Sequence, residues 1–224
     1  MLFYGPTDPY VLIAGEPAIM DQETPIPGGT GTYLYKKTLY EGRFLTLKGV
    51  DITGTSSGPA QAIRFGENGY YTIKLEGENK ISGFSSGIVA PNVSGVNDVK
   101  VVLSGSGSLD ISANQYAIDM QVGNLKFENT GEIKLTTGYV FTLPLNALRV
   151  KSGSIIIDNT KYDIVGVKQD KDGTREDISD NPNLDTILKG TSTDKDLYFK
   201  SITITPAAAK PSTISYNGKT LKQG

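Results

Sequence analysis

The sequence predicts an all-β protein folded as a right-handed parallel β-helix, or solenoid, of about six rungs with N- and C-terminal caps. Three observations predict this fold. Short runs of alternating apolar residues recur at a near-regular interval, and most are followed by a third short apolar piece. The 224-residue chain also contains 26 glycines, which suit tight corners that need positive φ.

Six runs carry the repeat. Each alternates with period 2 on both sides of a polar or glycine turn, as in VVLSGSGSLDIS at Val101–Ser112, and this is typical of strands rather than helices. The second apolar residue marks each run, and the markers are Leu47, Leu75, Leu103, Phe127, Val150 and Phe199. Their intervals are 28, 28, 24, 23 and 49. Equivalent side chains are therefore expected to stack one turn apart.

A third apolar piece follows most runs, and three short strands separated by corners are what one rung of a solenoid needs. The pieces are AIRF at Ala62–Phe65, GIVA at Gly87–Ala90, YAID at Tyr116–Asp119, YVFT at Tyr139–Thr142 and YDIV at Tyr162–Val165. An antiparallel sandwich is the alternative, since its strands also come every 8–12 residues or so. It does not explain a pattern that repeats in threes.

The chain divides into three segments. Residues 1–40 lie outside the repeat and predict an N-terminal cap, with a strand pair at Tyr10–Ala14 and Ala18–Met20. Residues 41–206 hold the β-helix repeats, interrupted by an acidic insertion at 166–196 that we expect to be a solvated loop with Leu184–Leu188 packing back as a partial rung. Residues 207–224 predict a linker and a C-terminal hairpin around Asn217–Gly218.

Composition limits the chemistry. The formal net charge is −2 and no Lys/Arg-rich block occurs, which argues against a nucleic-acid partner. No stretch approaches the roughly 20 apolar residues of a membrane span, so membrane insertion is not expected. The absence of His excludes imidazole acid–base chemistry, Ser–His triads and His-ligated zinc. No signal peptide is visible at Met1–Gly15, and one would have been removed from an extracellular protein.

The residues also carry a resemblance. An opening strand pair, a TGTYLYKKTL approach, then LTLKGVDITG, TIKLEGENKISG and VVLSGSGSLDIS resemble the β-helical, pectin-lyase-like repeat of surface proteins of gut-type bacteria that are often labelled carbohydrate-binding domain-containing proteins. The likeness covers roughly Tyr10–Asp158. Lys36 and Lys37 replace the aromatic and acidic residues typical of the approach segment. The resemblance implies an extracellular β-helix and a carbohydrate ligand.

The sharpest candidate site is a row of tyrosines. Tyr116, Tyr139 and Tyr162 are spaced 23 and 23 residues apart, so a solenoid is expected to stack them. An exposed row is a candidate glycan platform, because a tyrosine ring covers the apolar face of a pyranose while its hydroxyl stays wet. The alternative is an internal stack, since Ile118, Phe141 and Ile164 share their strand face.

Calcium is the one cofactor that the sequence suggests. The insertion can be aligned with an EF-hand loop from Lys168 to Ser179, but the first and last positions lack their carboxylates. A looser oxygen cage from Asp170, Asp172, Glu176 and Asp177 is the metal-binding hypothesis, and a solvated acidic loop is the alternative.

These observations favour a non-catalytic, extracellular or cell-surface module for glycan binding or adhesion. A polysaccharide or a host or cell-surface glycan is the expected partner, with affinity gained through avidity rather than a deep pocket. One alternative is a polysaccharide lyase or glycoside hydrolase, which needs clustered carboxylates, whereas the acids of the repeats are scattered along the sequence. A structural spacer is the second alternative.

Overall fold

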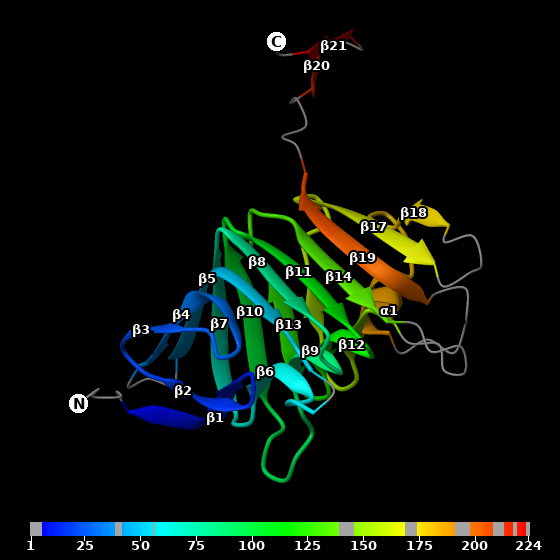
Figure 1. The fold of residues 1–224 in the computed structure, drawn as a ribbon. Helices are drawn as coiled ribbons and strands as arrows, with labels where there is room; N and C mark the ends of the chain where they lie inside the picture. Colours follow the sequence, from blue (N-terminus) through cyan, green and yellow to red (C-terminus); the bar gives the residue numbers. More distant parts are fainter. Residues whose placement is uncertain are drawn as a thin grey trace.

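The computed structural model describes residues 6–38, 42–55, 57–138, 146–168, 174–190 and 198–207, together with the backbone of 213–216 and 219–222. The chain coils through about four turns of a parallel β-solenoid, with successive turns side by side along one axis (Figure 1). This confirms the predicted fold class, although the coil is shorter than the six rungs expected.

Each complete turn supplies three strands, as the repeat predicts. The strands of the coil are β5 (Gly42–Thr53), β6 (Gln61–Phe65), β7 (Gly69–Glu76), β8 (Glu78–Ser82), β9 (Ser86–Ala90), β10 (Val99–Gly105), β11 (Ser108–Ala113), β12 (Tyr116–Met120), β13 (Asn124–Phe127), β14 (Ile133–Thr137), β15 (Leu148–Val150) and β16 (Ile155–Ile156). One sheet contains the parallel column β6, β9, β12 and β15; the larger sheet contains β5, β7, β10, β13 and β16 and, from the second half of β5, β8, β11 and β14.

The register shows which marker residues stack. Leu47 lies opposite Leu75 and Leu103 opposite Phe127, as predicted, in parallel strands. The predicted stacking of Leu75 on Leu103 is wrong, because Leu103 lies opposite Ile73 and Leu75 lies opposite Gly105. Val150 does not continue the column, because it belongs to β15 and lies opposite Met120 in the other sheet. The interval from Phe127 to Val150 therefore does not measure one turn.

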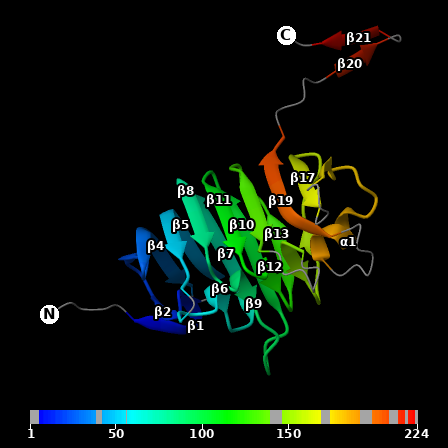
Figure 2. The ribbon, with the colours of Figure 1, turned by 45° about the vertical axis from the view of Figure 1, so that its right-hand side comes forward.

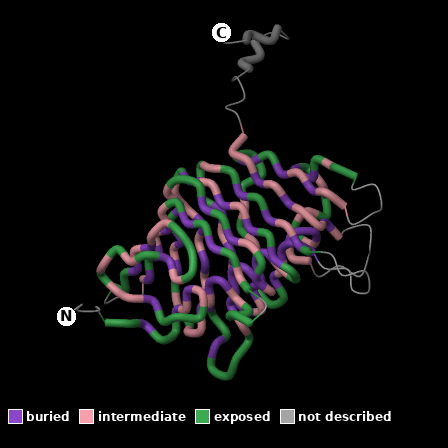
Figure 3. Tube along the Cα trace, in the orientation of Figure 1, coloured by how far each residue is buried: buried purple, intermediate pink, exposed green. Residues whose placement is uncertain are grey.

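The core fills the inside of the coil. Apolar side chains alternate along the strands and stack between turns, and one such column is Ile52, Ile81, Ile111 and Leu135, each at most 4% exposed. Figure 3 shows the resulting alternation of buried and exposed residues along the coil. Period-2 patterning thus places one face of each strand in a dry interior.

At the N-terminal end, antiparallel strands cover the first turn. β1 (Thr7–Ile13) pairs with β2 (Glu16–Ile19) and with β6, and β4 (Gly29–Lys37) pairs with β3 (Glu23–Pro25) and with β5. The predicted strand pair is therefore present. Because a bare terminal turn offers unpaired N–H and C=O groups to other chains, these strands close that edge (Figure 2).

At the C-terminal end, the prediction of further parallel rungs is wrong. Phe199 lies in β19 (Phe199–Pro206), which pairs antiparallel with β14, and YDIV lies in β17 (Tyr162–Lys168), which pairs antiparallel with β19 and with β18 (Arg175–Asp177). The alternation predicts these strands correctly, but alternation carries no information on strand direction.

The acidic insertion also differs from the prediction. Its apolar segment forms a helix, α1 (Leu184–Lys189), rather than a partial rung, and buries Ile187 and Leu188. The buried amide of Asn146 donates to the carbonyls of Ile187 and Leu148 at 2.6 and 2.9 Å, which fastens the helix to the last strand of the six-stranded sheet. The predicted C-terminal hairpin is present as β20 (Thr213–Tyr216) and β21 (Lys219–Lys222), a two-stranded sheet of its own.

A charged row crosses the outer face of the larger sheet. Asp51, Lys80, Asp110 and Lys134 lie opposite one another in successive strands, so negative and positive side chains alternate. Lys134 Nζ lies 3.7 Å from Asp110 Oδ2. Opposite charges on directly facing positions favour this register.

Candidate functional site

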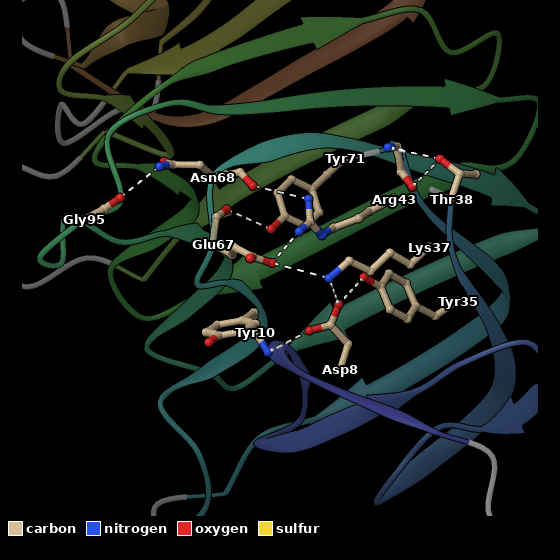
Figure 4. Close-up of polar contacts among 11 residues, drawn as sticks. Asp8, Tyr10, Tyr35, Lys37, Thr38, Arg43, Glu67, Asn68, Tyr71 and Gly95 are labelled. Carbon is tan, nitrogen blue, oxygen red and sulfur yellow. Dashed lines mark hydrogen bonds and ion pairs between the residues drawn. The ribbon is translucent and has the colours of Figure 1, made fainter. Parts of the chain in front are cut away.

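A cleft of about 480 Å³ lies where the N-terminal strands meet the first turns. Its lining comes from β1, the start of β5, the turn between β6 and β7, and the connection between β9 and β10: Tyr10, Arg43, Gly66, Glu67, Asn68, Gly69, Tyr70, Ser94, Gly95, Val96 and Asp98. We call this the tyrosine cleft. Figure 4 shows how part of its lining converges from strands far apart in the sequence.

Exposed aromatic rings flank the tyrosine cleft. Tyr10 is 49% and Tyr70 55% exposed, and Phe44 on the neighbouring strand is 45% exposed. Gly42 lies opposite Tyr70 in the register of β5 and β7, and the ring of Phe44 lies over Gly42. Half-exposed tyrosine rings beside a cleft are suited to stacking against the apolar face of a ligand.

Below these rings lies a network of paired charges. Arg43 is 4% exposed; its Nη2 donates to Glu67 Oε2 and its Nη1 donates to the carbonyl of Asn68 at 3.2 Å. Lys37 Nζ lies between two carboxylates, 3.6 Å from Glu67 Oε2 and 3.7 Å from Asp8 Oδ2. Figure 4 shows Lys37 linking the two sides.

Asp8 completes this network from β1. Its side chain is almost fully buried, accepts from the hydroxyl of Tyr35 at 2.7 Å and accepts from the backbone N–H of Tyr10 at 3.0 Å. A buried carboxylate needs such donors, because desolvation otherwise disfavours its charge. The hydrogen bond from the Tyr10 N–H to Asp8 therefore helps to hold the backbone of Tyr10 at the cleft.

Tyr71 supports the same network from the core side. Its ring packs 4.3 Å from that of Phe65, centroid to centroid, and the Arg43 guanidinium carbon lies 5.1 Å from the Tyr71 centroid. Burial raises the pKa of Tyr71 to about 12, against an opposing effect of Arg43. Burial likewise raises the pKa of Tyr35, with the Asp8 carboxylate adding to the effect.

One asparagine holds the outer wall of the cleft. Asn68 donates from Nδ2 to the carbonyl of Gly95 at 2.8 Å, and its Oδ1 accepts from the backbone N–H groups of Asn97 and Asp98 at 2.9 Å each. The connection between β9 and β10 is therefore fastened to the preceding turn before any ligand arrives.

A third cation, Lys100, lies near the opening and is paired as well. Lys100 Nζ lies 2.9 Å from the Tyr70 hydroxyl, 3.2 Å from Asp98 Oδ2 and 4.4 Å from the Tyr70 ring centroid. Hydrogen bonding to Tyr70 and then to Asp98 raises the pKa of Lys100. The cleft thus combines exposed rings with charges that already have protein partners.

The predicted tyrosine row is not formed by the two members that the structure describes. Tyr116 begins β12 in the six-stranded sheet, whereas Tyr162 begins β17 in the larger sheet. The physical reason is turn length: Ile118 lies opposite Leu148, so this turn is longer than the tyrosine spacing. Tyr139 lies outside the described residues.

The surroundings of these two tyrosines also differ from those of a platform. Arg149 donates to the Tyr116 hydroxyl at 2.8 Å, and its guanidinium carbon lies 3.9 Å from the Tyr116 centroid. The same guanidinium is held by Asp119 at 2.7 and 2.8 Å. Tyr162 is buried and donates to the carbonyl of Asn129 at 2.9 Å. Ligand binding by these tyrosines stays a prediction.

Two of the proposed calcium ligands, Asp170 and Asp172, lie outside the described residues. Glu176 pairs with Lys168 at 2.8 Å, and Asp177 Oδ1 accepts from the hydroxyl of Ser179 at 2.7 Å. Within the described part of the chain, no group of three acidic side chains could hold a metal ion. The calcium hypothesis therefore stays a prediction.

Sequence reasoning missed the tyrosine cleft because Asp8, Lys37, Arg43 and Glu67 are scattered over three elements and one turn. One signal was present. Tyr70 and Tyr71 are adjacent on an alternating strand, so one of the two rings had to face outward.

Two further observations concern the chain as a whole. None of the helices in the described ranges is long and apolar enough to cross a membrane. Comparisons of the chain with family models, curated proteins and solved structures find no match.

Proposed function

We propose that this chain is a non-catalytic, extracellular or cell-surface module for glycan binding or adhesion, and that the tyrosine cleft is its binding site. The observation that carries the proposal is the pair of half-exposed rings, Tyr10 and Tyr70, that flank one cleft over a fixed polar floor. The resemblance of the repeat to that of carbohydrate-binding surface proteins supports the same class of ligand.

Each part of the cleft has a role in this proposal. A pyranose presents an apolar C–H face that stacks on a tyrosine ring, and ring and sugar both leave water without losing hydrogen bonds. Polar groups along the wall, including the side chain of Ser94, then contact the sugar hydroxyls. Because Asn68 and the charge network already fix the walls, little conformational entropy is lost on binding.

A shallow cleft of this kind gives modest affinity for one sugar. Strong attachment to a surface then comes from many copies that bind one polymer or one cell wall. The predicted alternative of a lyase or hydrolase has less support, because the three carboxylates in and below the described cleft, Asp8, Glu67 and Asp98, are all engaged with cations.

A glycan array followed by titration calorimetry tests the proposal. The wild-type chain and the variants Tyr10→Ala and Tyr70→Ala are compared on the oligosaccharide that gives the strongest array signal. Each variant is expected to weaken binding about tenfold, equivalent to about 1.4 kcal/mol. Ile156→Ala, which removes an equally exposed apolar side chain from the last turn of the coil, is the matched control and is expected to bind as wild type.

The outcomes are distinct. Binding that is unchanged in both tyrosine variants excludes the tyrosine cleft as the site. No binding to any glycan on the array contradicts the proposed function and favours the structural spacer. Cleavage of the oligosaccharide during the titration favours the enzyme alternative.

A further inference from the structure

Three described cations in or beside the tyrosine cleft have protein anions as partners. Arg43 is paired with Glu67, Lys37 lies between Glu67 and Asp8, and Lys100 is paired with Asp98. Three positive and three negative groups therefore balance one another within the site. These six groups together carry no net charge, and each of them is already directed toward a neighbour.

This arrangement has a consequence for the ligand. A carboxylate or sulfate on a sugar gains affinity from a cation only if that cation gives up its present partner. For Arg43 the exchange is costly, because the residue is buried and Glu67 would lose its guanidinium. For Lys37 it would leave the buried Asp8 with neutral donors alone. Asp98 also stands beside Lys100 at the opening, where it repels an approaching anion.

Neutral sugars meet no such penalty. Their hydroxyls accept from and donate to polar groups without displacing a charge, and the exposed rings of Tyr10 and Tyr70 need only an apolar face opposite them. We infer that the tyrosine cleft selects neutral glycans and discriminates against uronic-acid and sulfated ones. This inference rests on the proposed function and specifies its ligand class.

Paired ligands test the inference directly. Binding is measured by calorimetry, at low and at high salt, to neutral hexasaccharides with glucan, mannan, galactan and xylan backbones, and to polygalacturonate, polymannuronate and sulfated galactan oligosaccharides of equal length. At least one neutral oligosaccharide is expected to bind about tenfold more tightly than every acidic one. Its Kd is expected to be insensitive to salt, because no net charge is neutralised on binding.

A variant that is expected to gain affinity for acidic oligosaccharides provides a second, more stringent test. Asp98→Asn leaves the backbone contact to Asn68 in place but removes the carboxylate partner of Lys100. It is expected to raise the affinity for an acidic oligosaccharide about tenfold, in a salt-sensitive manner, when compared with the affinity of the same variant for the neutral ligand. Asp110→Asn removes the carboxylate partner of Lys134 on another face. It makes the same change in net charge and is expected to alter neither affinity.

The possible results distinguish a failure of the neutral-glycan inference from a failure of the proposed glycan-binding function. Acidic oligosaccharides that bind the wild-type cleft as tightly as neutral ones overturn the inference but leave glycan binding intact. An Asp98→Asn variant that gains no more affinity than Asp110→Asn also overturns it, because Asp98 then does not exclude anions. Absence of binding to both ligand sets refutes the proposed function instead.

Discussion

The side-chain amide of Asn68 donates to the backbone carbonyl of Gly95 at 2.8 Å. This bond joins the turn between β6 and β7 to the connection between β9 and β10. Asn68 Oδ1 adds two further links, because it accepts hydrogen bonds from two backbone N–H groups of that connection. A loop that would otherwise depend on its own weak interactions is therefore held by the turn before it.

Replacing this asparagine is expected to loosen the cleft without unfolding the coil. In Asn68→Ala, the amides of Asn97 and Asp98 lose their acceptor, and their hydrogen exchange is expected to speed up about tenfold, with glycan affinity falling in parallel. Asn124→Ala is the control, because Asn124 accepts one backbone N–H, from Ser154, in the last turns. Fast exchange across the whole coil in Asn68→Ala would contradict a local role.

The charge network predicts a difference between two adjacent lysines. Lys37→Met removes a cation from the buried Asp8 and from Glu67, and is expected to lower the free energy of unfolding by about 1–3 kcal/mol. Lys36→Met changes an exposed side chain on the same strand, and is expected to stay within about 0.5 kcal/mol of wild type. Urea unfolding measures both, and equal effects would show that the ion pairs of Lys37 contribute little.

Alkaline pH is expected to destabilise the fold through its buried tyrosines. A tyrosine in the unfolded chain ionises near pH 10, whereas the pKa of Tyr71 is raised to about 12. Between these values the unfolded chain releases a proton that the folded chain keeps, so the free energy of unfolding falls as pH rises. For Tyr71 the slope is at most about 1.4 kcal/mol per pH unit, and no such slope is expected below pH 10 or so.

The variant Tyr71→Phe is expected to flatten this alkaline limb, while Tyr10→Phe, at an exposed position, leaves it unchanged. Denaturant titrations at pH values from neutral to strongly alkaline measure the slope. An unaltered slope in Tyr71→Phe would mean that Tyr71 already ionises near pH 10 in the folded state.

The inner columns of the coil predict large effects of core truncation. Ile111 is fully buried between Ile81 and Leu135 of the neighbouring turns. Ile111→Ala is expected to cost about 2–5 kcal/mol and Ile111→Val about 0.5–1.5 kcal/mol. Thermal and urea unfolding measure both. Equal losses in the two variants would indicate that neighbouring turns collapse onto the cavity.

The sequence predicted the fold class and much of the coil because period-2 alternation identifies strands and their inward faces without reference to the rest of the chain. Leu47 opposite Leu75 and Leu103 opposite Phe127 are the direct outcome. Turn length was harder. Lys100 lies opposite Asn124 but Leu125 lies opposite Ile155, so successive turns differ in length. Residues that are equally spaced in the sequence therefore do not occupy equivalent positions in successive turns. The tyrosine row failed for this reason.

Strand direction and the cleft were not accessible from local pattern. β17 and β19 alternate like any strand of the coil, and only their packing against β14 shows that they run antiparallel. The cleft depends on Asp8, Lys37 and Glu67 meeting in space, and each of these residues alone resembles an ordinary surface charge. Long-range pairing decides such sites, and a single sequence contains no local signature of it.

The alternating row formed by Asp51, Lys80, Asp110 and Lys134 limits the number of turns that the solenoid can gain or lose without placing like charges opposite each other. Deleting the turn that carries Lys80 would bring Asp51 against Asp110, and duplicating it would set two lysines face to face, with like charges destabilising either product. Deleting or duplicating two consecutive turns preserves the order of signs. A change by an even number of turns therefore keeps opposite charges facing each other along this row, whereas a change by one turn does not.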